Sequence, residues 1–127
     1  MSYYFSKRLD CPFSEAVDRA IAALKAHGFG VLTRIDVQST LKEKIGADFR
    51  PYVILGACNP KMAHQALMAE DKIGTMLPCN VVIQEFEGLT EVAAVDPVAS
   101  MQAIQNEALG VIAEKVRGEL KAAVESI

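Results

Sequence analysis

The stretch Tyr52-Val53-Ile54-Leu55-Gly56-Ala57-Cys58-Asn59-Pro60 carries the strongest structural signal in the sequence. Residues 52–57 are apolar at successive positions, which is typical of a strand covered on both faces. The sequence leaves open whether a second helix layer or another subunit provides the second cover. Asn is a favoured N-cap and Pro suits the first helical turn. We therefore expect a central strand over residues 52–57, followed by a helix over residues 60–71.

Four further segments have the composition of strands. Residues 3–9 alternate loosely and are rich in aromatic side chains, and residues 29–37 are rich in β-branched side chains. Residues 81–86 and 92–95 are separated by a loop of hairpin length that contains Gly88. This spacing predicts that the last two strands pair antiparallel.

Apolar periodicity predicts a helix near each end of the chain. After Ser14, a favourable N-cap, apolar residues recur at i, i+3, i+4 and i+7, which predicts a helix over residues 15–27. A longer stripe of the same spacing follows Asn106 and predicts a long C-terminal helix. Thr40 opens a capping-box pattern, which predicts a short helix that Gly46 ends.

These elements predict an α+β fold, a two-layer sandwich. We expect about five strands in a mixed sheet, with helices packed mainly on one face. Asp96-Pro97 starts either a short separate helix or a kinked first turn of the C-terminal one. At 127 residues, the chain is expected to form one domain over residues 1–127. A doubly wound parallel sheet is less favoured, because residues 9–13 lack a Gly-rich phosphate-binding turn.

Composition narrows the classes of function. With 13 Lys and Arg against 16 Asp and Glu, the net charge is −3, which argues against the basic surface that nucleic-acid binding needs. The densest apolar run, residues 52–58, is far shorter than a membrane span of about 20 residues. The first residues lack the apolar segment of a signal peptide, and three cysteines are too few for a secreted disulfide framework. We therefore expect a cytoplasmic protein with no membrane or nucleic-acid partner.

Two similar tripeptides lie where strands meet loops, Cys58-Asn59-Pro60 and Pro78-Cys79-Asn80. If the two strands are antiparallel, these corners share one edge of the sheet, whereas in a parallel arrangement they lie at opposite edges. We take Cys58, Asn59, Cys79 and Asn80 as the candidate site, with both arrangements left open.

The cysteines of this candidate site admit two interpretations. Cys58 precedes a helix N-terminus, where the helix dipole and free N–H groups favour a thiolate, and Cys79 could resolve an oxidised Cys58 or share a soft metal with it. The alternative is that both are inert core residues, because cysteine is among the most often buried residue types. Cys11 is expected to be an incidental surface thiol.

Other motifs give weaker signals. No zinc-type spacing of ligands and no assembled catalytic set occurs in the sequence, so we predict neither a metal site nor a cofactor, and an enzymatic activity stays uncertain. His64 and Met68 have the i, i+4 spacing of a haem or copper ligand pair, but a solvated helix face explains them better. The methionine-rich segment of residues 62–77 could line a ligand groove or fill the core.

Several motifs together resemble one prokaryotic family, the Domain of Unknown Function 302. The resemblance rests on residues 28–37, 48–52, 55–60 and 77–82, and it spans nearly the whole chain. It implies a small α+β domain, found alone or in tandem, that forms homodimers. The family has no settled activity, so it supplies no catalytic residue. Its two Cys-Asn motifs correspond to Cys58-Asn59 and Cys79-Asn80, and Cys11 matches no motif of the family.

The sequence therefore favours a homodimeric cytoplasmic module that binds a small molecule near Asn59 and Asn80. The main alternative is a thiol-based redox or sulfur-handling protein that uses Cys58 and Cys79. A third hypothesis is an interaction domain in which the dimer surface is itself the function.

Overall fold

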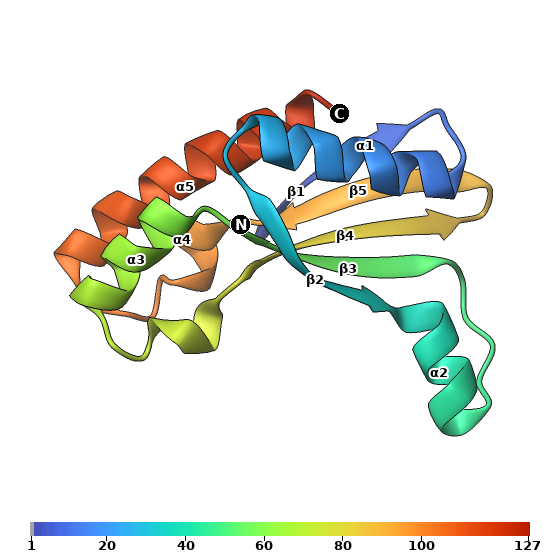
Figure 1. Cartoon of the computed structure of the whole chain (residues 1–127), viewed down its shortest axis with the longest axis horizontal. Coiled ribbons are helices and arrows are strands. Elements are labelled where there is room, and N and C mark those ends of the chain that lie inside the picture. Colours follow the sequence, from blue (N-terminus) through green and yellow to red (C-terminus); the bar gives the residue numbers. More distant parts are fainter. Residues whose placement is uncertain (1) are drawn as a thin grey trace.

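The strands form one antiparallel sheet in the order β1-β5-β4-β3-β2 (Figure 1). The computed structural model describes residues 2–127. Within this range the strands are β1 (Tyr4–Leu9), β2 (Gly30–Asp36), β3 (Tyr52–Cys58), β4 (Cys79–Phe86) and β5 (Leu89–Val95). The expected number of strands is confirmed, as is the hairpin of the last two, in which Phe86 faces Leu89 across the turn.

Every strand pair is antiparallel, where the sequence predicted a mixed sheet. The reason lies in the long connection between β3 and β4, which does not cross a face of the sheet. It contains α3 (Pro60–Ala69) and the 3-10 helix η1 (Ile73–Met76), and it stays beyond one end of the strands (Figure 1). β4 therefore starts at the same end of the sheet where β3 finishes, and it runs in the opposite direction. The central strand is β4, and β3 lies one position from the edge.

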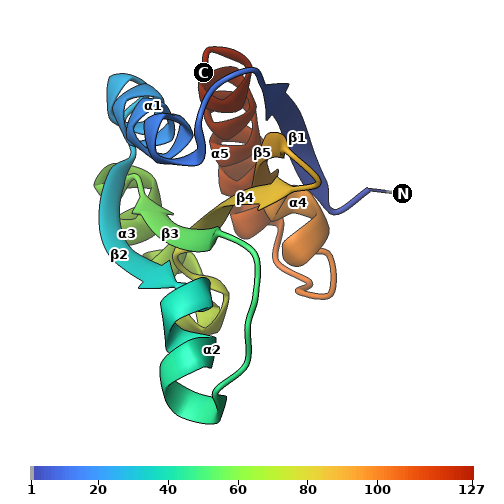
Figure 2. The ribbon, with the colours of Figure 1, turned by 90° about the vertical axis from the view of Figure 1, so that its right-hand side faces the viewer.

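The remaining helices are α1 (Phe13–Ala26), α2 (Val37–Ile45), α4 (Pro97–Ser100) and α5 (Glu107–Glu125). The long C-terminal helix is confirmed, and α1 lies beside α5 on one face of the sheet (Figures 1 and 2). By contrast, α2 projects from the end of β2, and none of its residues is buried. No helix among the described residues has the length and apolar character that crossing a membrane requires.

Two helices start earlier than predicted. α1 begins at Phe13, ahead of Ser14, which lies inside the helix and is exposed. α2 begins at Val37 because Asp36 is its N-cap: the Asp36 side chain accepts a hydrogen bond from the Ser39 N–H at 3.0 Å. The predicted capping box at residue 40 therefore lies inside the helix.

The core lies between the sheet and the layer of α1 and α5. Alternate residues of β3, β4 and β5 face this layer and are buried, among them Val53, Leu55, Val81 and Ile83. The opposite side of the sheet, which we call the open face, is covered by no layer of helices from residues 2–127. It carries the residues that alternate with the core positions: Tyr4, Arg8, Ile35, Tyr52, Ile54, Asn80, Val82, Gln84, Phe86, Leu89, Glu91 and Ala93.

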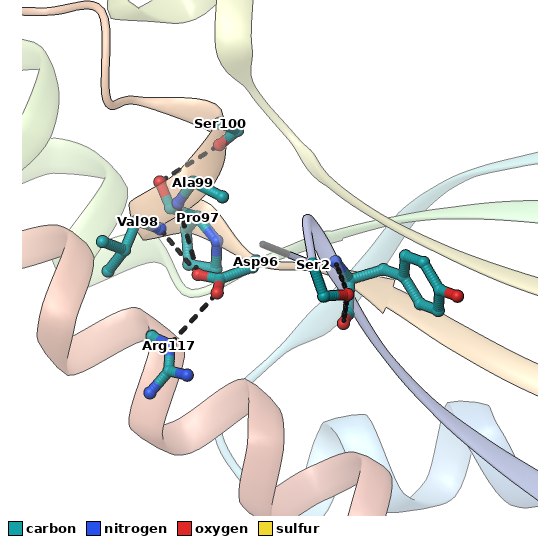
Figure 3. Close-up of polar contacts among 8 residues, drawn as sticks. Ser2, Asp96, Pro97, Val98, Ala99, Ser100 and Arg117 are labelled. Atoms are coloured by element: carbon teal, nitrogen blue, oxygen red, sulfur yellow. Dashed lines mark hydrogen bonds and ion pairs between the residues drawn. The ribbon is translucent and has the colours of Figure 1, made fainter.

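One buried carboxylate joins the sheet to the helical layer (Figure 3). Asp96 is 8% exposed, and its Oδ1 accepts from the N–H groups of Val98 at 3.0 Å and Ala99 at 3.4 Å. Its Oδ2 accepts from Nε of Arg117, on α5, at 3.2 Å. The same guanidinium lies over the ring of Phe5, 5.1 Å from its centroid. The side chain therefore caps α4, as the sequence predicted, and also holds α4 against α5.

Replacing Asp96 by Ala should lower the free energy of unfolding by about 1–3 kcal/mol, because the cap is lost and Arg117 is left without its partner. Urea unfolding followed by circular dichroism measures the change. Asp36→Ala is the matched control, since Asp36 caps α2 at an exposed site, and it should cost about 1 kcal/mol or less. Equal losses in the two variants would contradict a joining role for Asp96.

Candidate functional site

An apolar cavity lies where the end of β3 meets the start of β4, beneath α3 and α5. Its volume is about 30 Å³, enough for one or two water-sized groups. Its walls come from β3, α3, the segment before β4, and α5. The lining residues are Phe29, Ala57, Cys58, Asn59, Met62, Ala63, Ala66, Leu77, Pro78, Cys79, Met101, Ile112, Ala113 and Val116.

Three of the four predicted site residues line this cavity. Cys58, Asn59 and Cys79 meet there because β3 and β4 pair antiparallel, with Ala57 opposite Cys79 in the register. Of the two arrangements that the sequence left open, the antiparallel one is therefore present. Cys58 and Cys79 therefore lie at the same end of the two neighbouring strands.

Asn80 does not reach this cavity. It follows Cys79 along β4, so its side chain points to the other side of the sheet, where it is exposed on the open face. There it lies opposite Gly56 and lines a separate hollow with Tyr52 and Gln84. The prediction that both amides border one site is therefore wrong, because neighbouring residues of a strand face opposite sides.

Asn59 has a structural role in the wall of the cavity. Its Oδ1 accepts from the N–H of Met62 at 3.2 Å, which makes it the N-cap of α3, as the sequence predicted. The amide group also lies against Gly28, at the end of α1: a Cβ at this glycine would be 3.1 Å from Nδ2. Gly28 has a φ of +85°, so glycine is favoured there for its backbone as well. The end of α1 and the start of α3 therefore lie close together.

Gly56 allows Pro78 to close over β3. A Cβ on Gly56 would overlap Thr33 Oγ1 and would lie 2.7 Å from Cγ of Pro78. Glycine is therefore required here for close approach of neighbouring chain segments. Because Pro78 also lines the cavity, the absence of a side chain at Gly56 helps to set the position of the cavity wall.

The two thiols have different environments. Cys79 is buried at 7% exposure, whereas Cys58 is half-buried. Burial, and to a smaller extent the nearby Cys58, raise the pKa of Cys79 from 9.0 to about 11. Cys79 is therefore a protonated thiol at neutral pH. Cys11, the third free cysteine, is half-buried against the hydrophobic core and does not line the cavity, where the sequence predicted a surface thiol.

The weaker candidates from the sequence lie away from this cavity. His64 and Met68 are both on the exposed side of α3, with Met68 77% exposed. Met76 is also exposed, so Met62 is the one methionine of this segment that lines the cavity. Among residues 2–127 no group of three or more His, Cys, Asp or Glu side chains is placed to hold a metal ion.

Sequence reasoning missed the part of the cavity that comes from α5 and the segment before it. Met101, Ile112 and Val116 line the cavity, yet they are distant in sequence from both cysteine corners. No local signal identifies them, because they read as ordinary positions of an amphipathic helix and its connection. Their role depends on α5 packing over the ends of β3 and β4.

A second cluster, also missed, lies on the open face around Arg50. Its guanidinium carbon lies 4.4 Å from the centroid of the Phe49 ring and 5.0 Å from that of the Phe86 ring. Its Nε donates to Oε1 of Gln84 at 2.8 Å. The local signal was the placement of Arg50 between Phe49 and Tyr52. This arginine is held in place by aromatic side chains, on the side of the sheet opposite the thiol cavity.

Comparison with known proteins places the chain in one family. The model of the family described as domain of unknown function DUF302 matches residues 5–127. The crystal structure of the uncharacterized conserved protein DUF302 from Bacillus stearothermophilus is similar, with 31% sequence identity and a TM-score of 0.93. That similarity covers 99% of this chain and 98% of the other.

No protein with a curated function matches the chain. The family match and the shared fold nevertheless agree over almost the full length of the sequence. The chain belongs to the DUF302 family.

Proposed function

We propose that this protein is a homodimeric ligand-binding module of the cytoplasm, and that its ligand occupies the cavity between α3, α5 and the ends of β3 and β4. The observation that supports this most is the meeting of Cys58, Asn59 and Cys79 at one cavity. Three free cysteines suit a reducing compartment.

The size and lining of the cavity restrict the ligand. Typical pockets for drug-sized ligands have roughly 300–1,000 Å³, whereas this cavity has about 30 Å³. Its walls are mostly aliphatic side chains, the ring of Phe29, and the sulfur-bearing side chains. A ligand that enters without rearrangement is therefore very small and apolar, or it binds through sulfur. Flexible methionine side chains give the cavity some capacity to adapt.

The alternative function, thiol redox chemistry, has the proximity of Cys58 and Cys79 in its favour. Against it stands the environment of Cys79: the thiolate is the reactive form, and burial raises the pKa of Cys79 to about 11. At neutral pH this residue is a poor attacking or resolving thiol. Binding is therefore better supported than exchange of disulfides.

The open face is where we place the dimer contact. Its apolar side chains include Tyr4, Ile35, Phe86 and Leu89, all of them exposed. Arg8 and Glu91 are direct cross-strand neighbours on the same face. In a two-fold dimer one patch meets its own copy, so a patch that carries both signs of charge can complement itself. A second copy of this chain therefore suits the face better than a partner of one charge.

Ligand binding can be tested by thermal unfolding in the presence of a panel of small apolar metabolites. A ligand at 100 times its Kd should stabilise the protein by about 2.7 kcal/mol. Ala63→Leu should abolish that shift, because Ala63 lines the cavity and the added atoms fill it. Gln65→Leu, on the exposed side of the same helix, should retain it. No shift with any compound would count against metabolite binding.

The dimer can be tested by light scattering coupled to size-exclusion chromatography. The wild-type chain should have twice the mass of one chain at micromolar concentration, and Phe86→Glu should give a monomer. Phe86 is 55% exposed on the open face, and the matched control is Val111→Glu, which lies 59% exposed on α5 and should remain dimeric. A monomeric wild type would refute the dimer.

Thiol reactivity should depend on pH in a way that separates the two cavity cysteines. In the folded Cys11→Ser protein, iodoacetamide should alkylate Cys58 well before Cys79. The reason is that only about 0.1% of Cys79 is thiolate at pH 8. The rate at Cys79 should rise up to about pH 11. Mass spectrometry of peptides from native and denatured protein measures both rates. Rapid labelling of native Cys79 at pH 7 would favour the redox function instead.

The raised pKa of Cys79 also makes the free energy of unfolding depend on pH. The unfolded chain loses this proton near pH 9.0, whereas the folded protein keeps it to about pH 11. The part of the folding stability that depends on this proton is therefore present in full below pH 9, and it is lost as the pH rises from 9.0 to about 11. In Cys79→Ala this part of the alkaline decrease should be absent.

A further inference from the structure

Four sulfur-bearing side chains from separate segments line the cavity. Cys58 ends β3, Cys79 begins β4, Met62 lies in the first turn of α3, and Met101 follows α4. Ala57, the residue before Cys58, lies opposite Cys79 in the register of β3 and β4. The other methionines on α3 and η1, Met68 and Met76, are exposed to solvent. Four sulfur atoms are thus brought to one position in the fold.

The nature of these donors selects a class of ion. Thiolate and thioether sulfur are soft ligands that favour Cu(I) among the biological metals. Zinc takes three or four nitrogen, thiolate or carboxylate ligands, and the cavity offers only two thiols among the described residues. Hard cations such as Mg²⁺ and Ca²⁺ require oxygen ligands, which an apolar lining does not provide.

The charge of the ion and the size of the cavity also favour a soft monovalent cation. A buried net charge is costly in apolar surroundings. A monovalent cation on a single thiolate forms a neutral unit, whereas a divalent cation on one thiolate leaves a net charge. The cavity volume of about 30 Å³ is suited to one ion and is far too small for a drug-sized ligand.

We propose that the cavity binds one soft monovalent cation of the Cu(I) class, with the thiolate of Cys58 as the charged ligand and the neutral sulfurs of Cys79, Met62 and Met101 beside it. This inference rests on the proposed ligand-binding function and names the class of ligand for the same cavity.

The binding step balances without electron transfer. The cation bonds to Sγ of Cys58, the less buried thiol, and the thiol proton passes to solvent. Sγ of Cys79 keeps its proton and, like the thioether sulfurs of Met62 and Met101, lies beside the bound cation as a neutral, weaker sulfur ligand. Since metal binding competes with protons for a thiol, affinity should rise with pH.

The test uses Ag(I), a soft monovalent ion that does not change oxidation state under these conditions, with the full-length Cys11→Ser protein. Isothermal titration should give one ion per chain, with about one proton released to solvent. Cys58→Ser should weaken binding on the order of 100-fold, and Cys79→Ser, which removes a neutral sulfur, roughly 10-fold. Zn²⁺ should not displace the bound ion.

Substitution of the methionines distinguishes a site with several sulfur ligands from a single reactive thiol. Met62→Leu combined with Met101→Leu conserves volume and should weaken Ag(I) binding roughly 10-fold. Met68→Leu, at an exposed position of the same helix, should leave binding unchanged. Thermal unfolding verifies that each variant is folded. If the double methionine variant binds as tightly as the Cys11→Ser protein, or if Cys58→Ser does, the inference is overturned.

The outcome also distinguishes this inference from the proposed function. Weak Ag(I) binding together with a metabolite shift that Ala63→Leu removes would leave the cavity a ligand site and exclude the cation. Failure of both experiments would remove the ligand-binding function itself.

Discussion

The antiparallel register between β3 and β4 is the constraint on which the site depends. With Ala57 opposite Cys79, the last residues of one strand lie beside the first residues of the next. A shift of one residue would turn the side chains of β4 to the other face of the sheet, because strand side chains alternate. The burial of Val81 and Ile83 under the helical layer prevents such a shift. The hydrophobic core therefore determines where the two thiols meet.

The same alternation divides the chemistry of the molecule between two faces. The cavity collects sulfur, aliphatic groups and one ring on the side where α3 and α5 cover the strand ends. The open face collects aromatic side chains with Arg8, Arg50 and Glu91. Asn80 belongs to the second face although it follows Cys79 directly in sequence. A ligand in the cavity and a partner on the open face would therefore not compete for the same surface.

Burial explains why the thiols are better suited to holding a ligand than to turnover. Desolvation disfavours the charged form of Cys79, which keeps its proton at neutral pH. A soft cation can replace a thiol proton and leave a neutral unit, so it offsets part of that cost. A small apolar ligand avoids the cost altogether. Both kinds of occupant are compatible with walls that supply few polar groups.

Local patterns determined much about this protein without any structure. The strand over residues 52–57, the N-caps Asn59 and Asp96, the hairpin at Gly88 and the long helix after Asn106 all follow from interactions between residues near in sequence. Strand order, the antiparallel sense of β3 and β4, and the contribution of Met101 and Val116 to the cavity were decided only by tertiary packing. The side on which Asn80 lies was decided in the same way. These features arise from burial of apolar surface between segments far apart in the chain, and no local pattern of residues encodes which distant segment will cover which.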